Sequence, residues 1–168
     1  MRAALVALGP PERGTKTVLR FSKKMLFAIE AVLDIAYHAG TEPVQSREIT
    51  RRQNIPQRYL EQALQQLVRE NILTGIRGPK GGYRLARERR RITVRDIVRA
   101  VRKTESSDDP IKDTESWELG QKVVRPLWVD LWESLMDKLD DVTIEAFCKK
   151  AADAGIASEN KKKLDFTI

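Results

Sequence analysis

The sequence predicts a mainly α protein with one small β-hairpin and a long C-terminal helix. Apolar residues recur at three- and four-residue spacing in several segments, as they do on one face of a helix. Two short alternating runs flank a glycine-rich tip near the middle of the chain, which is typical of a hairpin. With 168 residues, the chain is long enough for one compact domain and an appendage.

Composition limits the kinds of site that the chain can build. It has one cysteine, Cys148, and one histidine, His38, so a single chain cannot assemble a disulfide framework or a conventional zinc site. This composition favours a reducing, cytoplasmic setting. The apolar run at the start ends at Gly9, short of a signal peptide, and we expect neither an export signal nor a membrane span. No nucleophile–base pair or carboxylate dyad stands out, so we predict no catalytic residues and no enzyme activity.

Charge is distributed unevenly along the chain. Residues 1–103 carry 22 Lys and Arg against 9 Asp and Glu, whereas residues 104–168 carry 9 against 15. Such asymmetry suggests that the first part binds a polyanion and that the second part has a different role. A merely solvated basic face is the alternative that charge alone leaves open.

The first helix is predicted over residues 22–39, after a flexible extension at 1–20 whose Gly and Pro residues prevent a sustained helix. Ser22 is a suitable N-cap, and Gly40 ends the helix. The apolar stripe of this helix is predicted to consist of Leu26, Ile29, Leu33 and Ala36.

Two further helices follow, separated by a turn at 54–56 that contains a proline. The first is predicted over 46–53 with Ile49 facing inward, and the second over 57–71. This pattern is typical of a helix-turn-helix, whose second helix lies in the DNA major groove, although any helical pair in a bundle can look similar. The second helix is predicted to turn Leu60, Leu64, Leu67 and Val68 inward and Arg58, Glu61, Gln62, Gln65, Gln66 and Arg69 outward.

The stretch I-R-G-P-K-G-G-Y-R at 76–84 is predicted to form the hairpin tip. Its glycines permit positive φ and Pro79 adds rigidity, while Arg77, Lys80 and Arg84 project from it. A phosphate-binding loop and a dinucleotide fingerprint are both excluded, because the stretch has neither glycine pattern and opens no helix. A hairpin directly after a helix-turn-helix predicts a winged domain over 21–103, with a hairpin that has no nucleic-acid role as the alternative.

The C-terminal part is predicted to begin with an acidic linker loop at 104–118. Residues 119–157 then hold a dimerisation helix and a short terminal helix capped by Thr143, followed by a flexible tail at 158–168. The apolar stripe over 123–139 is too wide for one small core, so a second chain should bury part of it. Folding back on its own domain is the alternative. The residues predicted to contribute most to a homodimer interface are Leu127, Trp128, Leu131, Leu135 and Leu139.

Three segments carry a resemblance to a known family. They are Y-L-E-Q-A-L-Q-Q-L-V at 59–68, I-R-G-P-K-G-G-Y-R-L-A at 76–86 and I-T-V-R-D-I-V-R-A-V at 92–101. In these segments the chain resembles the Rrf2 family of bacterial transcription regulators, and the likeness covers roughly residues 19–151. The resemblance implies a homodimer, a winged domain that contacts DNA, and a long C-terminal helix that crosses to the partner chain.

Some members of this family carry an iron–sulfur cluster, and the resemblance locates their ligands. Three cysteines belong to the loop that corresponds to 104–115, a histidine precedes an L-W pair, and some members add an acidic ligand from the first helix. Here the loop has no cysteine, Arg125 stands in the histidine's place before Leu127, and Leu26 matches the acidic position. Iron in such a cluster requires thiolate or imidazole ligands, so we predict no metal and no cofactor.

The resemblance also places the DNA contacts. Gln62 suits adenine, Arg58 suits guanine or a phosphate, and Glu61 can accept a hydrogen bond from cytosine N4. Arg77 suits a narrow minor groove. The residues predicted to bind DNA are Gln57, Arg58, Tyr59, Glu61 and Gln62 in the recognition helix and Arg77 and Lys80 in the wing.

The predicted function is that of a cytoplasmic regulator, specifically a repressor, that binds a pseudopalindromic operator in double-stranded DNA as a homodimer. The rivals are an architectural nucleic-acid binder and a protein-interaction adaptor regulated by a metabolic enzyme. The effector, a small molecule or a partner protein, stays open. Cys148 lies beside Lys149 and Lys150, which could favour its thiolate, but a buried apolar cysteine is commoner. His38 is expected to have a capping or packing role.

Overall fold

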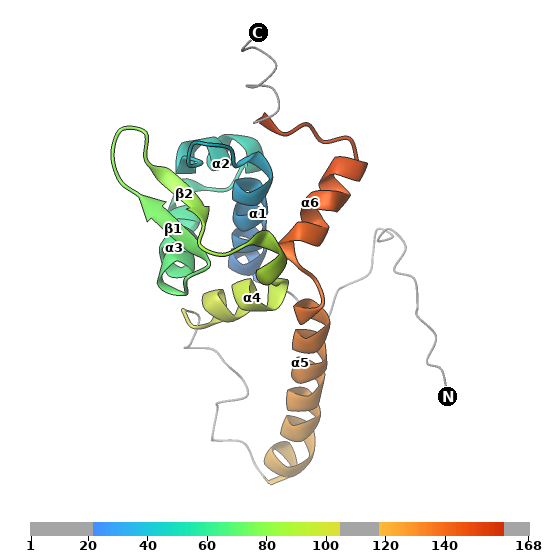
Figure 1. The fold of residues 1–168 in the computed structure, drawn as a ribbon. Coiled ribbons are helices and arrows are strands. Elements are labelled where there is room, and N and C mark those ends of the chain that lie inside the picture. Colours follow the sequence, from blue (N-terminus) through green and yellow to red (C-terminus); the bar gives the residue numbers. More distant parts are fainter. Residues whose placement is uncertain (1–21, 105–117, 160–168) are drawn as a thin grey trace.

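The structure is a computed structural model that describes residues 22–104 and 118–159 (Figure 1). The predicted extension at 1–20 lies outside the described residues, as do positions 105–117 of the predicted linker and 160–168 of the predicted tail. The elements are α1 (Lys23–His38), α2 (Ser46–Gln53), α3 (Gln57–Arg69), β1 (Leu73–Ile76), β2 (Gly82–Leu85), η1 (Arg89–Arg91), α4 (Val94–Arg102), η2 (Gly120–Val124), α5 (Arg125–Asp140) and α6 (Ile144–Asp153). The fold is therefore mainly helical with one two-stranded hairpin, as predicted.

Helix α1 is the centre of the domain and contacts α2, α3, α4, α6 and β2. Ser22 caps it as predicted, because its hydroxyl accepts a hydrogen bond from the Met25 N–H at 3.2 Å. The predicted apolar stripe is wrong in its phase: Leu26 is 46% exposed, and Ile29 and Leu33 are only partly buried. Positions 25–29 are all apolar, so their spacing does not define one face. The face that enters the core consists of Met25, Ala28, Ala31, Val32, Ile35 and Ala36.

Helices α2 and α3 form the predicted pair. Ile49 is fully buried, as expected. Asn54 ends α2 in the left-handed conformation at φ 52°, which asparagine tolerates better than most residues. Ile55 is also fully buried and ties the turn to the core, so that α3 starts at Gln57 in a defined position.

Two residues of α3 differ from the prediction. Val68 is 37% exposed, whereas Gln66 is buried and its amide donates to Glu70 at 3.4 Å. Both flank the buried stripe that contains Leu64 and Leu67. The neighbouring elements cover the side of the stripe that carries Gln66 and leave the side that carries Val68 exposed. Hydrophobic periodicity does not contain this information, so it predicts both residues incorrectly.

The hairpin is held against the rest of the domain by a third extended segment. In the hairpin, Leu73 lies opposite Leu85 and Ile76 opposite Gly82. Val44 and Tyr83 then exchange two backbone hydrogen bonds, of 3.0 and 2.8 Å. A Cβ at Gly82 would lie 2.5 Å from the Val44 carbonyl oxygen, so this close approach requires glycine.

Arg84 does not project from the wing as predicted. Its guanidinium donates a hydrogen bond to the backbone carbonyl of Thr41, in the connection between α1 and α2. Arg84 therefore fastens the hairpin to the domain.

The C-terminal half of α5 packs on the domain, while its N-terminal half and η2 extend beyond it (Figure 1). Met136 is buried, and Trp132 and Leu139 pack against the core. The Arg102 guanidinium on α4 lies 4.1 Å from the centroid of the Trp132 ring, in a cation–π contact. The long helix is thus anchored at one end and projects at the other.

A single π-helical turn, η2, precedes α5. The Arg125 N–H donates to the carbonyl of Gly120, five residues back. Pro126 has no N–H, and its ring would clash with the carbonyl four residues back in a regular α-helix. The wider turn accommodates the proline, which lies in the first turn of α5.

Helix α6 begins at the predicted cap, Thr143, whose hydroxyl accepts from the Ala146 N–H. The prediction of a flexible tail from residue 158 is wrong at its start, because Ser158 and Glu159 pack on α1 and α2. The Ser158 hydroxyl donates to the Tyr37 carbonyl at 2.8 Å, and the Glu159 N–H donates to His38 Nδ1 at 3.1 Å. We call residues 156–159 the C-terminal strap.

A buried ion pair joins α1 to α2. The side chain of Asp34 is fully buried and accepts hydrogen bonds from Arg52 at 2.7 and 2.9 Å and from Gln53 at 2.8 Å. Glu159 of the C-terminal strap accepts from the other side of the Arg52 guanidinium at 2.6 Å. Both Asp34 and Arg52 are therefore compensated, as buried charges must be.

We expect Asp34→Ala to lower the free energy of unfolding by about 3–5 kcal/mol, because it leaves the Arg52 guanidinium inside the domain without its main partner. Chemical denaturation followed by circular dichroism measures this loss. The control is Asp153→Ala, which deletes an exposed carboxylate in the last turn of α6 and should change the free energy of unfolding by less than about 0.5 kcal/mol. Equal effects of the two substitutions would contradict a structural role for the ion pair.

The pKa of His38 is lowered, chiefly by burial and further by the Arg52 charge, against opposing effects of Asp34, Glu159 and Glu48. The unfolded chain therefore takes up a proton more readily, and stability that is complete above about pH 6.5 should decline as the pH falls through the pKa of the folded state. Protonation also removes the acceptor for the Glu159 N–H. Denaturation midpoints at about pH 7.5 and pH 5.5 measure the decline.

His38→Asn is the matched variant for this pH prediction, because an amide oxygen can accept the same hydrogen bond and does not titrate. Its midpoint should fall less than that of the parent over the same interval. A parallel fall in both proteins would show that other groups cause the pH dependence.

Candidate nucleic-acid interface

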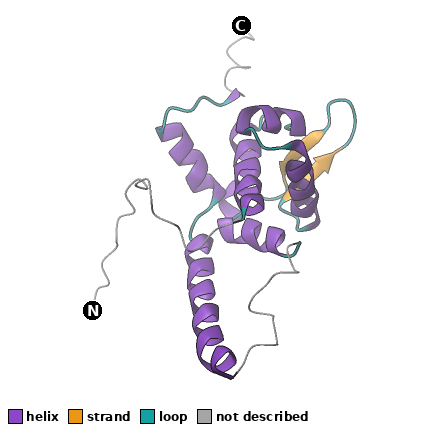
Figure 2. Ribbon diagram, turned by 180° about the vertical axis from the view of Figure 1, so that it is seen from behind, coloured by secondary structure: helices purple, strands orange, loops and turns teal. Residues whose placement is uncertain are grey.

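The outer face of α3 and the hairpin lie side by side, as opposite views of the molecule agree (Figures 1 and 2). The buried residues Leu60, Leu64 and Leu67 fix the rotation of α3 about its axis. The remaining face points to solvent and carries all five residues predicted to bind DNA from this helix. Exposed there are Gln57, Arg58, Tyr59, Glu61 and Gln62.

The polar residues of this face are partly organised among themselves. The Gln57 amide donates to Glu61 at 2.8 Å, one helical turn along. Arg58 and Gln62 form no hydrogen bond or ion pair within the described residues, so their donors are free for a ligand. A ligand that binds this face therefore meets two side chains with free donors, Arg58 and Gln62, beside the carboxylate of Glu61.

The wing adds a second basic element. Arg77 and Lys80 are exposed at the tip and form no ion pair with any described residue. Gly78 holds φ +110°, which a residue with a side chain rarely adopts, and thereby allows the tight turn between them. Both predicted wing residues are thus exposed at the tip of a hairpin whose strand β1 contacts α3.

The residues that orient these two elements are not predicted from the sequence. Asp34 and Arg52 fix the helix pair, and Val44 and Arg84 fix the hairpin. No local pattern marks them, because each acts through a partner distant in sequence. The one available signal is an aspartate within an apolar helix, where a charge needs a partner.

An exposed apolar face runs along the projecting part of η2 and α5. Leu127 is 60% exposed and Leu131 49%, unusually high for large apolar side chains that share one helix face. Leu135 is partly buried, and Leu139 packs against the core of its own chain, so these two differ in setting from the other predicted interface residues. The exposed face, which we call the α5 apolar face, consists of Leu119, Val123, Val124, Leu127, Trp128 and Leu131.

Cys148 is a buried packing residue of α6. Burial raises the pKa of its thiol, against an opposing contact with Arg89. This contradicts the alternative in which Lys149 and Lys150 favour the thiolate, since both lysines are exposed while the thiol is enclosed. Within residues 22–104 and 118–159, no helix is long and apolar enough to cross a membrane.

Comparison with known proteins gives consistent matches. A family model described as Rrf2, iron-dependent transcriptional regulator, matches residues 21–150. The chain is 34% identical over 133 residues to the HTH-type transcriptional regulator IscR of Xenorhabdus nematophila, covering 78% of this chain and 80% of that protein. The structure of T. potens IscR has a TM-score of 0.65 at 32% identity, covering 84% and 94% of the two chains. CymR, the global cysteine regulator of B. subtilis, has a TM-score of 0.62 at 28% identity, covering 79% and 98%.

The ligand atoms of this chain do not fit the iron that the family description implies. Its one cysteine, Cys148, is enclosed in the core, and its one histidine, His38, accepts a hydrogen bond from the C-terminal strap. No three His, Cys, Asp or Glu side chains lie close enough to hold a metal ion in the part of the chain that the structure describes. Iron–sulfur clusters are held by thiolates with occasional imidazoles, which this chain cannot supply in number.

The matched residues span the helix pair, the wing, α4, α5 and most of α6. They agree closely with the resemblance noted over residues 19–151. The relatives are transcription regulators and not enzymes, in agreement with the absence of a predicted catalytic site. The chain therefore belongs to the Rrf2 family of DNA-binding transcription regulators.

Proposed function

We propose that this regulator is a repressor that binds a pseudopalindromic operator as a homodimer, in the cytoplasm and without a metal cofactor. The observation that carries the proposal is the pairing of a solvent-facing α3 and basic wing with an uncovered apolar helix face elsewhere on the chain. The first surface suits duplex DNA, and the second suits another copy of the same chain.

In this proposal, α3 enters the major groove. Gln62 offers the two-fold donor and acceptor pattern that adenine matches, and Arg58 takes a guanine or a neighbouring phosphate. Glu61 accepts from cytosine N4, and its hydrogen bond from Gln57 holds the carboxylate in place before DNA arrives. Arg77 enters the adjacent minor groove while Lys80 neutralises a phosphate.

Two-fold symmetry would follow from the α5 apolar face. A pair of winged domains reads an inverted repeat at a fixed half-site spacing only if a rigid element sets their separation. Helix α5 is anchored by Trp132 and Met136 at its C-terminal end, which supports this role. A dimer placed over a promoter by such contacts represses by occupying the site that RNA polymerase needs.

In vitro selection from a random duplex library should recover one inverted repeat. On that operator, Arg77→Ala should weaken binding by about 1–3 kcal/mol, because it removes a charged contact to the DNA. Arg90→Ala removes the same charge from an exposed site on η1, outside α3 and the wing, and should bind nearly like the parent. Gel-shift titrations at one fixed salt concentration measure both variants.

Other outcomes of the selection identify the rival functions. Enrichment of no sequence despite tight, salt-sensitive binding would indicate an architectural binder. Absence of DNA binding by the folded protein would instead favour an adaptor that acts through a protein partner. An unchanged affinity of Arg77→Ala for the selected operator would remove the wing from the interface.

The parent protein should be a dimer at micromolar concentration in light scattering. Replacing both Leu127 and Leu131 by Glu should yield monomers, because it would bury unpaired carboxylates in the interface. The variant should retain its helical content, since both positions are solvent-facing within one chain.

The double substitution Asp130→Lys and Glu133→Lys is the matched control for the dimer. It also changes two exposed residues of α5, but outside the α5 apolar face. This control should remain dimeric. A monomeric parent, or a dimeric Leu127→Glu, Leu131→Glu variant, would refute the proposed assembly.

A further inference from the structure

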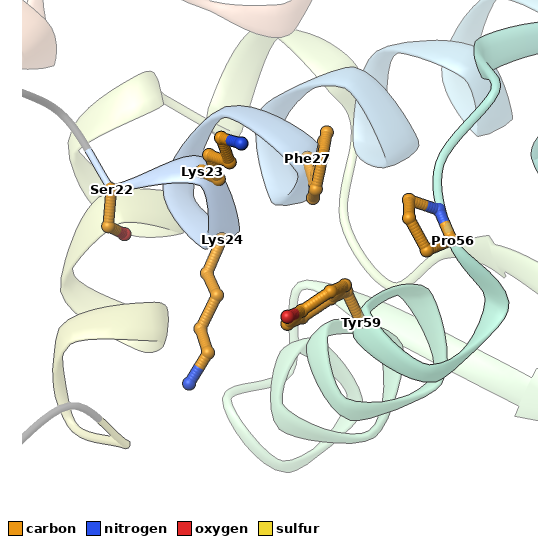
Figure 3. A pocket seen from close by; sticks show the side chains of 6 residues that line it. All are labelled: Ser22, Lys23, Lys24, Phe27, Pro56 and Tyr59. Atoms are coloured by element: carbon orange, nitrogen blue, oxygen red, sulfur yellow. The ribbon is translucent and has the colours of Figure 1, made fainter.

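A cleft of about 350 Å³ lies between the first turns of α1 and α3 (Figure 3). It lies at the junction between α1, the central helix, and the N-terminal end of the recognition helix, α3. Its position, next to the part of α3 that is proposed to enter the major groove, raises the question of its ligand. The cleft is lined by Ser22, Lys23, Lys24, Phe27, Pro56 and Tyr59.

Tyr59 belongs both to the cleft and to the outer face of α3. Its ring is tilted against Phe27, with the two centroids 6.3 Å apart, and its side chain is 46% exposed. At 100° of rotation per residue, Gln57 and Glu61 lie within the solvent-facing arc of α3, and Tyr59 lies at the margin of that arc, toward α1. Its hydroxyl points to the side of the cleft where the Lys24 side chain extends (Figure 3).

The charge of the cleft is positive and uncompensated. No carboxylate lines it, and neither Lys23 nor Lys24 forms an ion pair within the described residues. The Ser22 hydroxyl accepts from the Met25 N–H, and the two lysine side chains supply the positive charge. Phe27, Pro56 and the Tyr59 ring supply apolar walls. A ligand that matches this lining has an anionic group attached to a carbon framework.

The sugar–phosphate backbone of duplex DNA has this chemistry, and it borders the groove on either side of a recognition helix. If base edges face Gln57, Glu61 and Gln62, a DNA strand beside the major groove passes the margin of the solvent-facing arc of α3. Tyr59 and the cleft lie at this margin. We propose that Lys24, assisted by the Tyr59 hydroxyl, binds a backbone phosphate there. The inference rests on the proposed function, to which it adds a positioning contact from α1.

The contact has a distinctive consequence for affinity. A phosphate is the same in every sequence, so Lys24 should strengthen binding to the operator and to random DNA by the same factor. It should also add about one released counterion to the salt dependence of binding. A residue that reads bases would instead affect the operator alone.

The test uses the full chain and the variant Lys24→Gln, with Lys149→Gln as the control. Lys149 is an exposed lysine of α6, so its loss changes the net charge equally without touching the cleft. Lys24→Gln should bind both the selected operator and a random duplex about tenfold more weakly, with the magnitude of the log–log salt slope reduced by about one. Tyr59→Phe, which keeps the ring, should show a smaller loss that is also equal on both duplexes.

Three results would overturn the inference. Lys24→Gln could match Lys149→Gln on both duplexes, or weaken binding to the operator alone, or leave the salt slope unchanged. If the parent recovers no operator but binds random DNA, the repressor proposal fails while the random-duplex titration still decides the role of Lys24. If the cleft takes only small anions, Lys24→Gln will weaken the binding of inorganic phosphate while its affinity for both duplexes stays equal to that of Lys149→Gln, and this result would also overturn the inference.

Discussion

The buried carboxylate of Asp34 constrains most of this structure. It lies on α1, the helix that α2, α3, α4, α6 and β2 contact, and it pairs with Arg52 and Gln53 in the last turn of α2. The turn to α3 begins one residue later, so the ion pair determines the direction in which the recognition helix leaves α2. A charge inside a core is tolerated only with partners in defined geometry, and this requirement makes the pair a positional constraint more than a source of net stability.

The hairpin depends on the same central helix by a separate route. Val44, which follows α1 after a short connection, pairs with Tyr83, and Arg84 bonds to Thr41 in that connection. Both elements of the candidate DNA interface are therefore positioned by contacts with the C-terminal half of α1 and the connection that follows it. The C-terminal strap bonds at this end too, through Tyr37 and His38, and it follows α6, which comes directly after α5. One short region of α1 thus links the recognition elements with the C-terminal helices.

Much of the fold could be predicted from the sequence, because local rules determine it. The caps at Ser22 and Thr143, the bounds of α2 and the inward position of Ile49 all follow from short-range patterns. The errors arise where local rules are ambiguous. Five successive apolar positions in α1 do not reveal which face is buried, so the pattern predicts Leu26 inward although it is exposed. Helix α4, which carries Arg at several positions, is not predicted as a helix from the sequence.

The candidate DNA-binding residues could be chosen by type and position, and the structure exposes all of them. The contacts that hold these residues in position could not be predicted in this way. The supporting contacts join segments that are distant in sequence, and a single sequence does not show which distant residues meet. These contacts are Asp34 with Arg52, Glu159 with Arg52, and Tyr59 with Phe27.

The π-helical turn before Pro126 has a further geometric effect. Residues spaced by four advance about 40° around an α-helix with each step, so a face made of Leu119, Val123, Leu127 and Leu131 would wind around the axis. A wider turn rotates the chain less per residue, which cancels part of this drift and keeps the apolar side chains before and after the proline in phase with one another.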